Sequence, residues 1–205
     1  ARYQRLAGKE VFFLTGTDAV FAMREPGAGA SAKPTDGIDR QTEPIDGRVI
    51  RMRMLGAHPE PELVPGAELP GVSHYYLGDD PAQWRTGVRS FDSVRIAGAY
   101  QGVDVVYYDR DGSLEYDFVL AAGADPSEIE LAFEGADEVT VSGDGSLLVR
   151  AGPCELSQVP PSAYQLRGEV RESVVGRYAV TSEGAVRFNL GEYDRTRPLV
   201  IDPAV

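Results

Sequence analysis

Short runs of β-branched and aromatic residues, separated every few positions by Gly, Pro, Asp or Asn, recur from one end of the chain to the other. Amphipathic helical periodicity, by contrast, is nearly absent. Because β-branched and aromatic side chains suit a pleated surface and the separating residues suit turns, the pattern predicts an all-β protein. Many short strands with frequent turns are typical of a β-sandwich or of paired twisted antiparallel sheets.

The predicted strands are residues 11–15, 19–24, 48–55, 73–77, 93–100, 103–109, 113–120, 128–134, 138–142, 146–150, 154–159, 162–167, 174–181, 185–190 and 198–202. The one helical signal is GDDPAQW at 78–84, where Asp80 can cap and Pro81 suits the first helical position. It supports a single short helical turn near 80–84. We expect Trp84, about one turn later, to anchor the edge of the core and not to form an exposed stacking platform.

Two segments depart from the strand pattern. Residues 25–47 are rich in Gly, Ala, Pro and Asp and predict a long flexible loop, because they cannot bury much apolar surface. Residues 57–71 carry prolines that exclude a central strand and favour an extended covering segment. Too little strand-like sequence precedes residue 57 to close a separate core, so we expect residues 1–205 to form a single domain.

The stretch VDVVYYDRDGSLEYDFVL at 103–120 crowds five carboxylates around one Asp-Gly pair. If Asp111 and Gly112 form a two-residue hairpin loop, the apolar and aromatic side chains of both strands share one face. A loop one residue longer would place Glu115 and Asp117 on that face, and burying unpaired carboxylates is costly. The pattern therefore predicts the two-residue loop, with Asp104, Tyr108, Glu115 and Asp117 on the opposite, solvent-exposed face.

The exposed carboxylates also suggest two kinds of site. Calcium prefers hard oxygen ligands, but the spacing around DRDG does not match an EF-hand loop, so a Ca²⁺ site is the minor alternative and no cofactor is expected. Glycoside hydrolysis needs two carboxylates at a defined separation across a cleft, which the spacing of Glu115 and Asp117 does not establish. The candidate binding residues are Asp104, Tyr108, Glu115, Asp117 and Trp84, with no catalytic and no metal-ligating residue assigned.

A second DGSL, at 144–147, repeats the first at 111–114. Here a three-residue loop, Gly143-Asp144-Gly145, places Val139 and Val141 on one face with Leu147 and Val149. The same tetrapeptide is therefore expected in a different register. We interpret it as reuse of favourable turn chemistry and not as an internal repeat.

The net charge of −12 disfavours nucleic acid and anionic membranes as partners. No basic run reverses it, and the arginines are expected to lie on solvated strand faces as ion-pair partners: Arg51, Arg53, Arg85, Arg89 and Arg95. No apolar run approaches the ~18 residues that a membrane span needs, and the first residues lack the pattern of a signal peptide. The chain is thus expected to be cytosolic or to have lost a leader.

Known catalytic motifs are lacking. Cys154 is the single cysteine, so it forms no disulfide within the chain, and we expect it to be a half-buried thiol at a strand start. His58 and His74 do not have the spacing of a zinc site. The sequence contains no nucleophile elbow, phosphate-binding loop or dinucleotide fingerprint, so we expect no enzymatic activity.

Residues 72–137, from VSHYYLGDD to AFEGAD, and the closing YDRTRPLVIDP resemble a bacterial domain of unknown function. That family stands at the N-terminal end of secreted or surface proteins, ahead of SBBP-type β-propeller repeats. The resemblance covers nearly the whole chain and departs mainly in the insert at 25–47. The matching positions are Gly78, Asp80, Pro81, Trp84, Arg85, Tyr100, Gly102, Asp104, Tyr107, Tyr108, Leu114, Glu115, Tyr116, Asp117, Phe118, Gly123, Ala124, Asp125 and Pro126.

The resemblance implies an extracytoplasmic all-β module with a removed leader, no established activity, and repeats beyond Val205. It also suggests a structural ion pair between Asp117 and an arginine such as Arg95. We therefore expect a non-enzymatic structural or interaction module whose partners are proteins or neighbouring repeats of the same chain. The alternatives are a carbohydrate-binding or hydrolytic module, with or without Ca²⁺, and a subunit that self-assembles through exposed sheet edges.

Overall fold

The computed structural model describes residues 3–7, 10–25, 47–76, 78–110 and 113–203, and within them the chain forms β-strands and two single 3-10 turns. The all-β prediction is confirmed, and so is the short turn capped by Asp80, whose carboxylate accepts from the Ala82 N–H. The expectation of a single such turn is wrong, because a second one, capped by Asp125, spans residues 126–128. The elements are β1 (Tyr3–Ala7), β2 (Glu10–Thr15), β3 (Asp18–Arg24), β4 (Gly47–Leu55), β5 (Glu62–Pro65), β6 (Glu68–Tyr75), η1 (Pro81–Gln83), β7 (Arg85–Phe91), β8 (Ser93–Tyr100), β9 (Val103–Arg110), β10 (Ser113–Leu120), η2 (Pro126–Glu128), β11 (Glu130–Glu134), β12 (Glu138–Val141), β13 (Leu147–Ala151), β14 (Cys154–Gln158), β15 (Ser162–Arg167), β16 (Val170–Val180), β17 (Val186–Leu190) and β18 (Leu199–Asp202).

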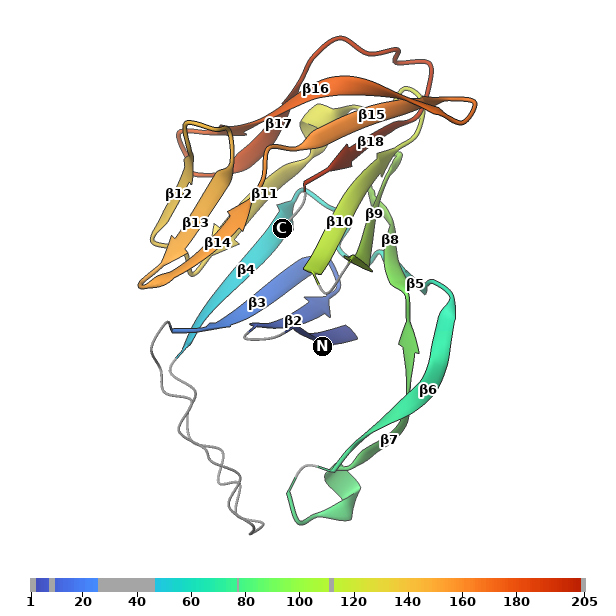
Figure 1. Cartoon of the computed structure of the whole chain (residues 1–205), viewed down its shortest axis with the longest axis vertical. Helices are drawn as coiled ribbons and strands as arrows, with labels where there is room; N and C mark the ends of the chain where they lie inside the picture. Colours follow the sequence, from blue (N-terminus) through green and yellow to red (C-terminus); the bar gives the residue numbers. More distant parts are fainter. Residues whose placement is uncertain (1–2, 8–9, 26–46, 77, 111–112, 204–205) are drawn as a thin grey trace.

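The strands form one large antiparallel sheet and two small ones (Figure 1). The large sheet has 13 strands in the order β1-β2-β3-β4-β11-β17-β16-β15-β18-β10-β9-β8-β5. A three-stranded sheet, β12-β13-β14, lies beside it, and β6 pairs with β7 in a separate hairpin. Most neighbours in the large sheet are consecutive in the chain. The neighbours that are not consecutive are β4-β11, β11-β17, β15-β18, β18-β10 and β8-β5.

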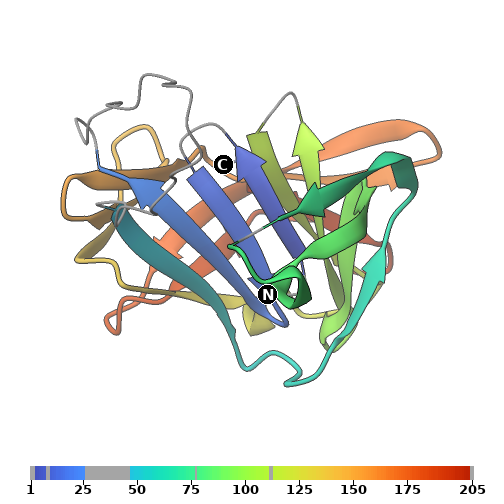
Figure 2. The ribbon, with the colours of Figure 1, turned by 90° about the horizontal axis from the view of Figure 1, so that it is seen from below.

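The large sheet curls around its own core, so that strands far apart in its order meet (Figures 1 and 2). The ring of Phe12 on β2 lies 5.6 Å from that of Tyr107 on β9, and the ring of Phe118 on β10 lies 5.5 Å from that of Phe188 on β17. These rings belong to one connected hydrophobic core. The expected pairing of twisted sheets is thus achieved by two parts of one sheet that face each other.

Both hairpin registers derived from the sequence are confirmed. In the first hairpin Arg110 pairs with Ser113, Tyr107 with Tyr116 and Val105 with Phe118, although Asp111 and Gly112 themselves lie outside the described residues. In the second, Val139 pairs with Val149 and Val141 with Leu147. The N–H of Ser142 donates to the Ser146 carbonyl and leaves the three-residue loop 143–145, in which Gly145 has a φ of +90°.

The segment at 57–71 contains β5, which is the last strand at one edge of the large sheet. This agrees with the exclusion of a central strand by the prolines. The flexible loop expected at 25–47 falls almost wholly on residues 26–46, outside the described residues, and β4 begins at Gly47. The division of the chain into one domain stays a prediction.

The strand β7 was not expected from the sequence. It pairs with β6 in a hairpin that extends away from the large sheet, with η1 at its tip (Figure 1). Trp84 lies at this tip and is 37% exposed, so its expected place at the edge of the core is wrong. The hairpin carries no buried residue among those described between 68 and 91.

Candidate functional site

Three of the predicted site residues lie together on the outer face of the large sheet, opposite the core. Tyr108 on β9 is directly across from Glu115 on β10, and Asp117 follows Glu115 on the same face. The Tyr108 hydroxyl is 3.3 Å from Glu115 Oε2 and 3.0 Å from Asp117 Oδ1. Because a phenol carries one hydroxyl proton, Tyr108 can donate to only one of these carboxylates at a time.

Arg110 covers this group from the same strand as Tyr108. Its Nη1 lies 2.8 Å from Glu115 Oε2 and 4.0 Å from Asp202 Oδ2, and its guanidinium stands over the Tyr108 ring at 5.4 Å. Asp202, on β18, thus joins the predicted residues. We call Tyr108, Arg110, Glu115, Asp117 and Asp202 the outer-face cluster.

The expectation that these carboxylates are solvent-exposed is wrong for Glu115, which is only 8% exposed, and Asp117 is half-buried. Their placement on the face opposite the aromatic core is nevertheless correct. Glu115 is covered because Arg110 and Tyr108 lie against it. Burial of a carboxylate is tolerated when a guanidinium and a hydroxyl replace the lost water, as they do here.

The burial also changes proton affinities in the cluster. The pKa of Asp117 is raised to about 6, chiefly because burial disfavours its charged form, and the nearby Asp202 and Glu115 act in the same direction. The hydrogen bond from Tyr108 and the charge of Arg110 oppose this rise. Burial likewise raises the pKa of Asp202, against the opposing charges of Arg110 and Arg171. Burial and Asp117 raise the pKa of Tyr108, so this phenol is a hydrogen-bond donor at neutral pH.

Asp104 is on the same face but has a different role. Its Oδ1 accepts from the Gly98 N–H at 2.8 Å, and its Oδ2 lies 3.0 Å from Arg95 Nη1. Gly98 has a φ of +62° at the point where the β8–β9 register shifts. Asp104 therefore holds a β-bulge in place. Arg95 pairs with it and not with Asp117 as the sequence suggested.

Trp84, the fifth predicted residue, is separate from the cluster because it lies at the tip of the β6–β7 hairpin. Its ring meets Tyr76 edge-on at 5.2 Å, and its Nε1 donates to the Gly78 carbonyl at 3.1 Å. The ring of His74 stacks on that of Tyr76, with the two ring centres 6.1 Å apart. The structure thus does not bring the aromatic and acidic candidates together.

Sequence reasoning missed the partners that β18, β15 and β16 supply. Asp202 sits in the predicted strand 198–202, but its pairing beside β10 required the tertiary fold. On the same outer face, the Arg171 guanidinium lies 4.3 Å from the centre of the Tyr164 ring. The alternation in LVID, with Asp202 two residues after Val200, was the one signal that could have assigned Asp202 to an outer face.

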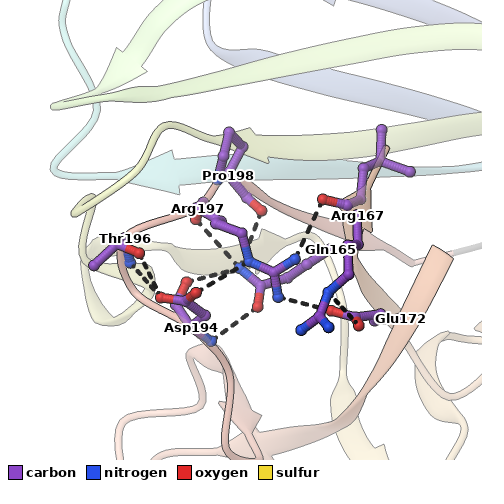
Figure 3. Close-up of polar contacts among 8 residues, drawn as sticks. Gln165, Arg167, Glu172, Asp194, Thr196, Arg197 and Pro198 are labelled. Atoms are coloured by element: carbon purple, nitrogen blue, oxygen red, sulfur yellow. Dashed lines mark hydrogen bonds and ion pairs between the residues drawn. The ribbon is translucent and has the colours of Figure 1, made fainter. Parts of the chain in front are cut away.

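A second polar group missed from the sequence surrounds Gln165, which is 3% exposed (Figure 3). Its Nε2 lies 2.8 to 3.2 Å from the carbonyl oxygens of Asp194, Arg197 and Pro198, among which its two N–H groups are shared, and its Oε1 accepts from the Asp194 N–H. Arg197 extends the network to Glu172 at 2.7 Å. A single amide thus contacts four backbone groups of one loop, which indicates that Gln165 anchors the loop before β18.

A shallow groove of about 710 Å³ lies near η2 and is lined by Phe188, Leu190, Tyr193 and Arg195, among others. None of the predicted site residues lines it. Within the described ranges, His, Cys, Asp and Glu side chains form no group of three that could hold a metal ion. Cys154 is buried, and its Sγ lies 3.6 Å from the Arg24 carbonyl oxygen. No helix in the described part of the chain is long and apolar enough to cross a membrane.

Comparisons with known proteins give a family and no function. No curated protein matches the chain, and no solved structure matches it either. The model of one protein family, described as a domain of unknown function (DUF7948), matches residues 1–204. This match spans nearly the whole sequence, including the outer-face cluster and the β6–β7 hairpin, and the chain therefore belongs to the DUF7948 family.

Proposed function

We propose that the chain is a non-enzymatic structural and interaction module of a bacterial secreted or surface protein, placed N-terminal to repeat domains outside the cytoplasm. Its all-β fold and its membership of a family without an assigned activity are compatible with this role. The resemblance noted in the sequence supplies the chain context. One observation carries the interaction role, namely the hairpin of β6, η1 and β7, which we call the arm.

The arm exposes apolar side chains without a described surface to cover them. Its two strands pack principally on each other, and no described residue from 68 to 91 is buried. The exposed apolar and aromatic residues on it are Leu69, Val72, Tyr76, Trp84 and Val88. A two-stranded hairpin alone is marginally stable in water, and clustered apolar exposure is typical of interaction surfaces. The arm therefore suits contact with a protein surface, for which we propose a neighbouring domain of the same chain.

Hydrogen exchange tests this proposal when it is measured on the isolated domain and on the full-length native protein. We expect the amides of the arm to exchange more slowly in the full-length protein, because a neighbour covers them there. Val72→Asp should abolish this difference, since a carboxylate on the contact surface must be desolvated. Equal exchange of the arm in both proteins would contradict the proposal.

Val49 supplies the matched control, because it is 57% exposed on β4 while Val72 is 53% exposed on the arm. Val49→Asp adds the same charge at a similar exposure outside the arm and should leave the protection of the arm unchanged. Light scattering of the isolated domain at several concentrations shows whether a second copy, and not a neighbouring domain, covers the arm. A mass that grows with concentration would favour self-assembly.

A glycan-binding module is the second candidate, and the aromatic group at the tip of the arm favours it. Tyr76 is 62% exposed and stands against Trp84 and His74, and exposed aromatic rings can stack on sugar rings. Calorimetric titration with glycans, with and without Ca²⁺, separates the candidates. Binding heat that Trp84→Ala abolishes would favour the glycan, and turnover on glycoside, ester or peptide substrates would exclude a non-enzymatic role.

A further inference from the structure

The strand β18 is the link between two parts of the large sheet, one that ends at β15 and one that begins at β10. It inserts between β15 and β10, and it is only four residues long. On the side of β10 its register pairs Phe118 with Ile201, Val119 with Val200 and Leu120 with Leu199. Three residue pairs thus connect β5, β8, β9 and β10 to the other strands through this seam.

Two carboxylates face each other at one end of the seam. Because Phe118 pairs with Ile201, the next position of the antiparallel register places Asp117 opposite Asp202. Both side chains lie on the outer face, since their neighbours Phe118 and Ile201 point into the core. Like charges directly opposite each other destabilise a strand pair.

The described donors do not reach every oxygen of the three carboxylates in the outer-face cluster. Arg110 is close to Glu115 but 4.0 Å from Asp202, and Tyr108 has one proton for Glu115 or Asp117. The Oδ1 atom of Asp202 is buried and accepts no hydrogen bond from any described residue. A proton on Asp117 would turn a repelling carboxylate into a hydrogen-bond donor beside it.

We propose that Asp117 and Asp202 form a proton-responsive latch, in which a proton bound to Asp117 relieves the repulsion between the two carboxylates and fastens β18 to β10, and the loss of this proton loosens the seam. The proton comes from water and returns to it, so no other reactant is needed. This device is independent of the arm. It makes the connection between the two parts of the sheet tighter at mildly acidic pH than at neutral pH.

The described charged groups around the pair shift the pKa of its carboxyl groups in opposite directions. Glu115 on β10 favours proton uptake, whereas Arg110 on β9 and Arg171 on β16 oppose it, and Tyr108 stabilises ionised Asp117 by its hydrogen bond. Tyr164 on β15 lies beside the cluster with its ring under Arg171, and Ser162 of the same strand pairs with Asp202. The raised pKa of Asp117, about 6, supports a transition between pH 5 and pH 7.

The latch is tested by NMR titration of the side-chain carboxyl carbons and by amide exchange at the seam. We expect Asp117 and Asp202 to titrate as a coupled pair, with one apparent pKa well above the usual value near 4. After correction for the intrinsic pH dependence of exchange, amides 199–201 should be protected on the order of tenfold more at pH 5 than at pH 7.5, as one pKa unit of linkage implies.

The variant D117N should remove most of this pH dependence, because an asparagine amide cannot titrate, and D202N should reduce it, because Asp202 supplies only part of the rise in the pKa of Asp117. Glu134→Gln is the matched control, since Glu134, on β11, forms an ion pair with Arg53 of β4 and lies outside the cluster. It should keep the wild-type behaviour. Ordinary pKa values for both aspartates, or equal protection of the seam at both pH values, would overturn the latch, and these wild-type measurements suffice if a variant does not fold.

Discussion

At the scale of residues, carboxylates on one sheet face differ because their neighbours differ. Asp104 accepts a backbone N–H and pairs with Arg95, so its negative charge is compensated. Asp117, two strand positions from Glu115, receives a single phenolic hydroxyl and faces Asp202. The first arrangement fixes a bulge, whereas the second stores unfavourable charge interactions that a proton can relieve.

Asp117→Asn should change the pH dependence of stability in a defined direction. Because the pKa of Asp117 is raised in the folded protein, the folded state binds the proton more tightly than the unfolded state. The stabilisation from this proton is fully present below the unfolded pKa near 4 and is lost as the pH rises through about 6. Above that pH the charged aspartate destabilises the folded state, and the variant removes this destabilisation.

The free energy of unfolding, measured by urea denaturation at pH 4.5 and pH 7.5, checks this prediction. The free energy of unfolding of Asp117→Asn minus that of the wild type should be on the order of 1 kcal/mol larger at pH 7.5 than at pH 4.5. Solvent screening of the half-buried side chain reduces the value to this size. Comparing two proteins at each pH cancels the titration of the carboxylates that do not interact with Asp117. A difference that shrinks as the pH rises would show that the sign is wrong.

The face on which each of these residues lies could be predicted from the sequence, but the burial could not. Alternation along 103–120 and the cost of buried carboxylates were enough to assign Glu115 and Asp117 to the outer face. The cover over Glu115 depends on the rotamer of Arg110, and the repulsion on Asp117 depends on Asp202, eighty-five residues later in the chain. No local pattern contains that information.

At the scale of elements, turns with a core on one side were predictable and the arm was not. The same DGSL tetrapeptide occurs in loops of two and three residues, because the apolar residues of the flanking strands set the register. The strand β7, RTGVRSF, has no such pattern. A hairpin that packs on no core needs no alternation of apolar and polar residues, and the prediction of strands from alternation therefore fails there.

Gly135 lets the chain leave the large sheet after β11 and enter the three-stranded sheet. Its φ is +87°, and a β-carbon at this position would overlap the Val49 carbonyl oxygen of β4. We expect Gly135→Ala to destabilise the protein by about 3 kcal/mol, because a left-handed conformation costs an L-residue roughly 1–2 kcal/mol and the backbone overlap adds to it. Thermal and urea denaturation measure the loss.

Gly184, in the turn between β16 and β17, is the control that separates the cost of the left-handed conformation from the cost of the overlap with β4. Its φ is +82°, but a β-carbon there would meet no atom within 4 Å. Gly184→Ala should therefore cost only the conformational part, roughly 1–2 kcal/mol. Equal losses for the two variants would mean that the close approach of Gly135 to β4 adds nothing.

At the scale of the whole molecule, the order of the strands in the sheet could not be predicted from the sequence. Most individual strands follow from local residue patterns, except β1, β5 and β7, and their large number indicated the all-β class. The insertion of β11 beside β4, and of the last strand, β18, between β15 and β10, depends on contacts between distant segments. Such contacts decide whether the strands make two sheets or one curled sheet, and local propensity is the same in both cases.

The contact between Phe12 and Tyr107 tests the curling of the sheet directly. These rings come from β2 and β9, nine places apart in the strand order, and both side chains are buried. A double-mutant cycle with Phe12→Leu and Tyr107→Leu should give a coupling energy on the order of 1 kcal/mol, as expected for aromatic rings in contact.

Phe188 supplies the control, because it packs on Phe118 and Tyr178. The effects of Phe12→Leu and Phe188→Leu on the free energy of unfolding should be additive within about 0.5 kcal/mol. Additive effects for Phe12 and Tyr107 as well would mean that the two parts of the sheet do not close on a shared core in solution, and the exposed area revealed by the urea dependence would then be smaller than that of a single cooperative unit.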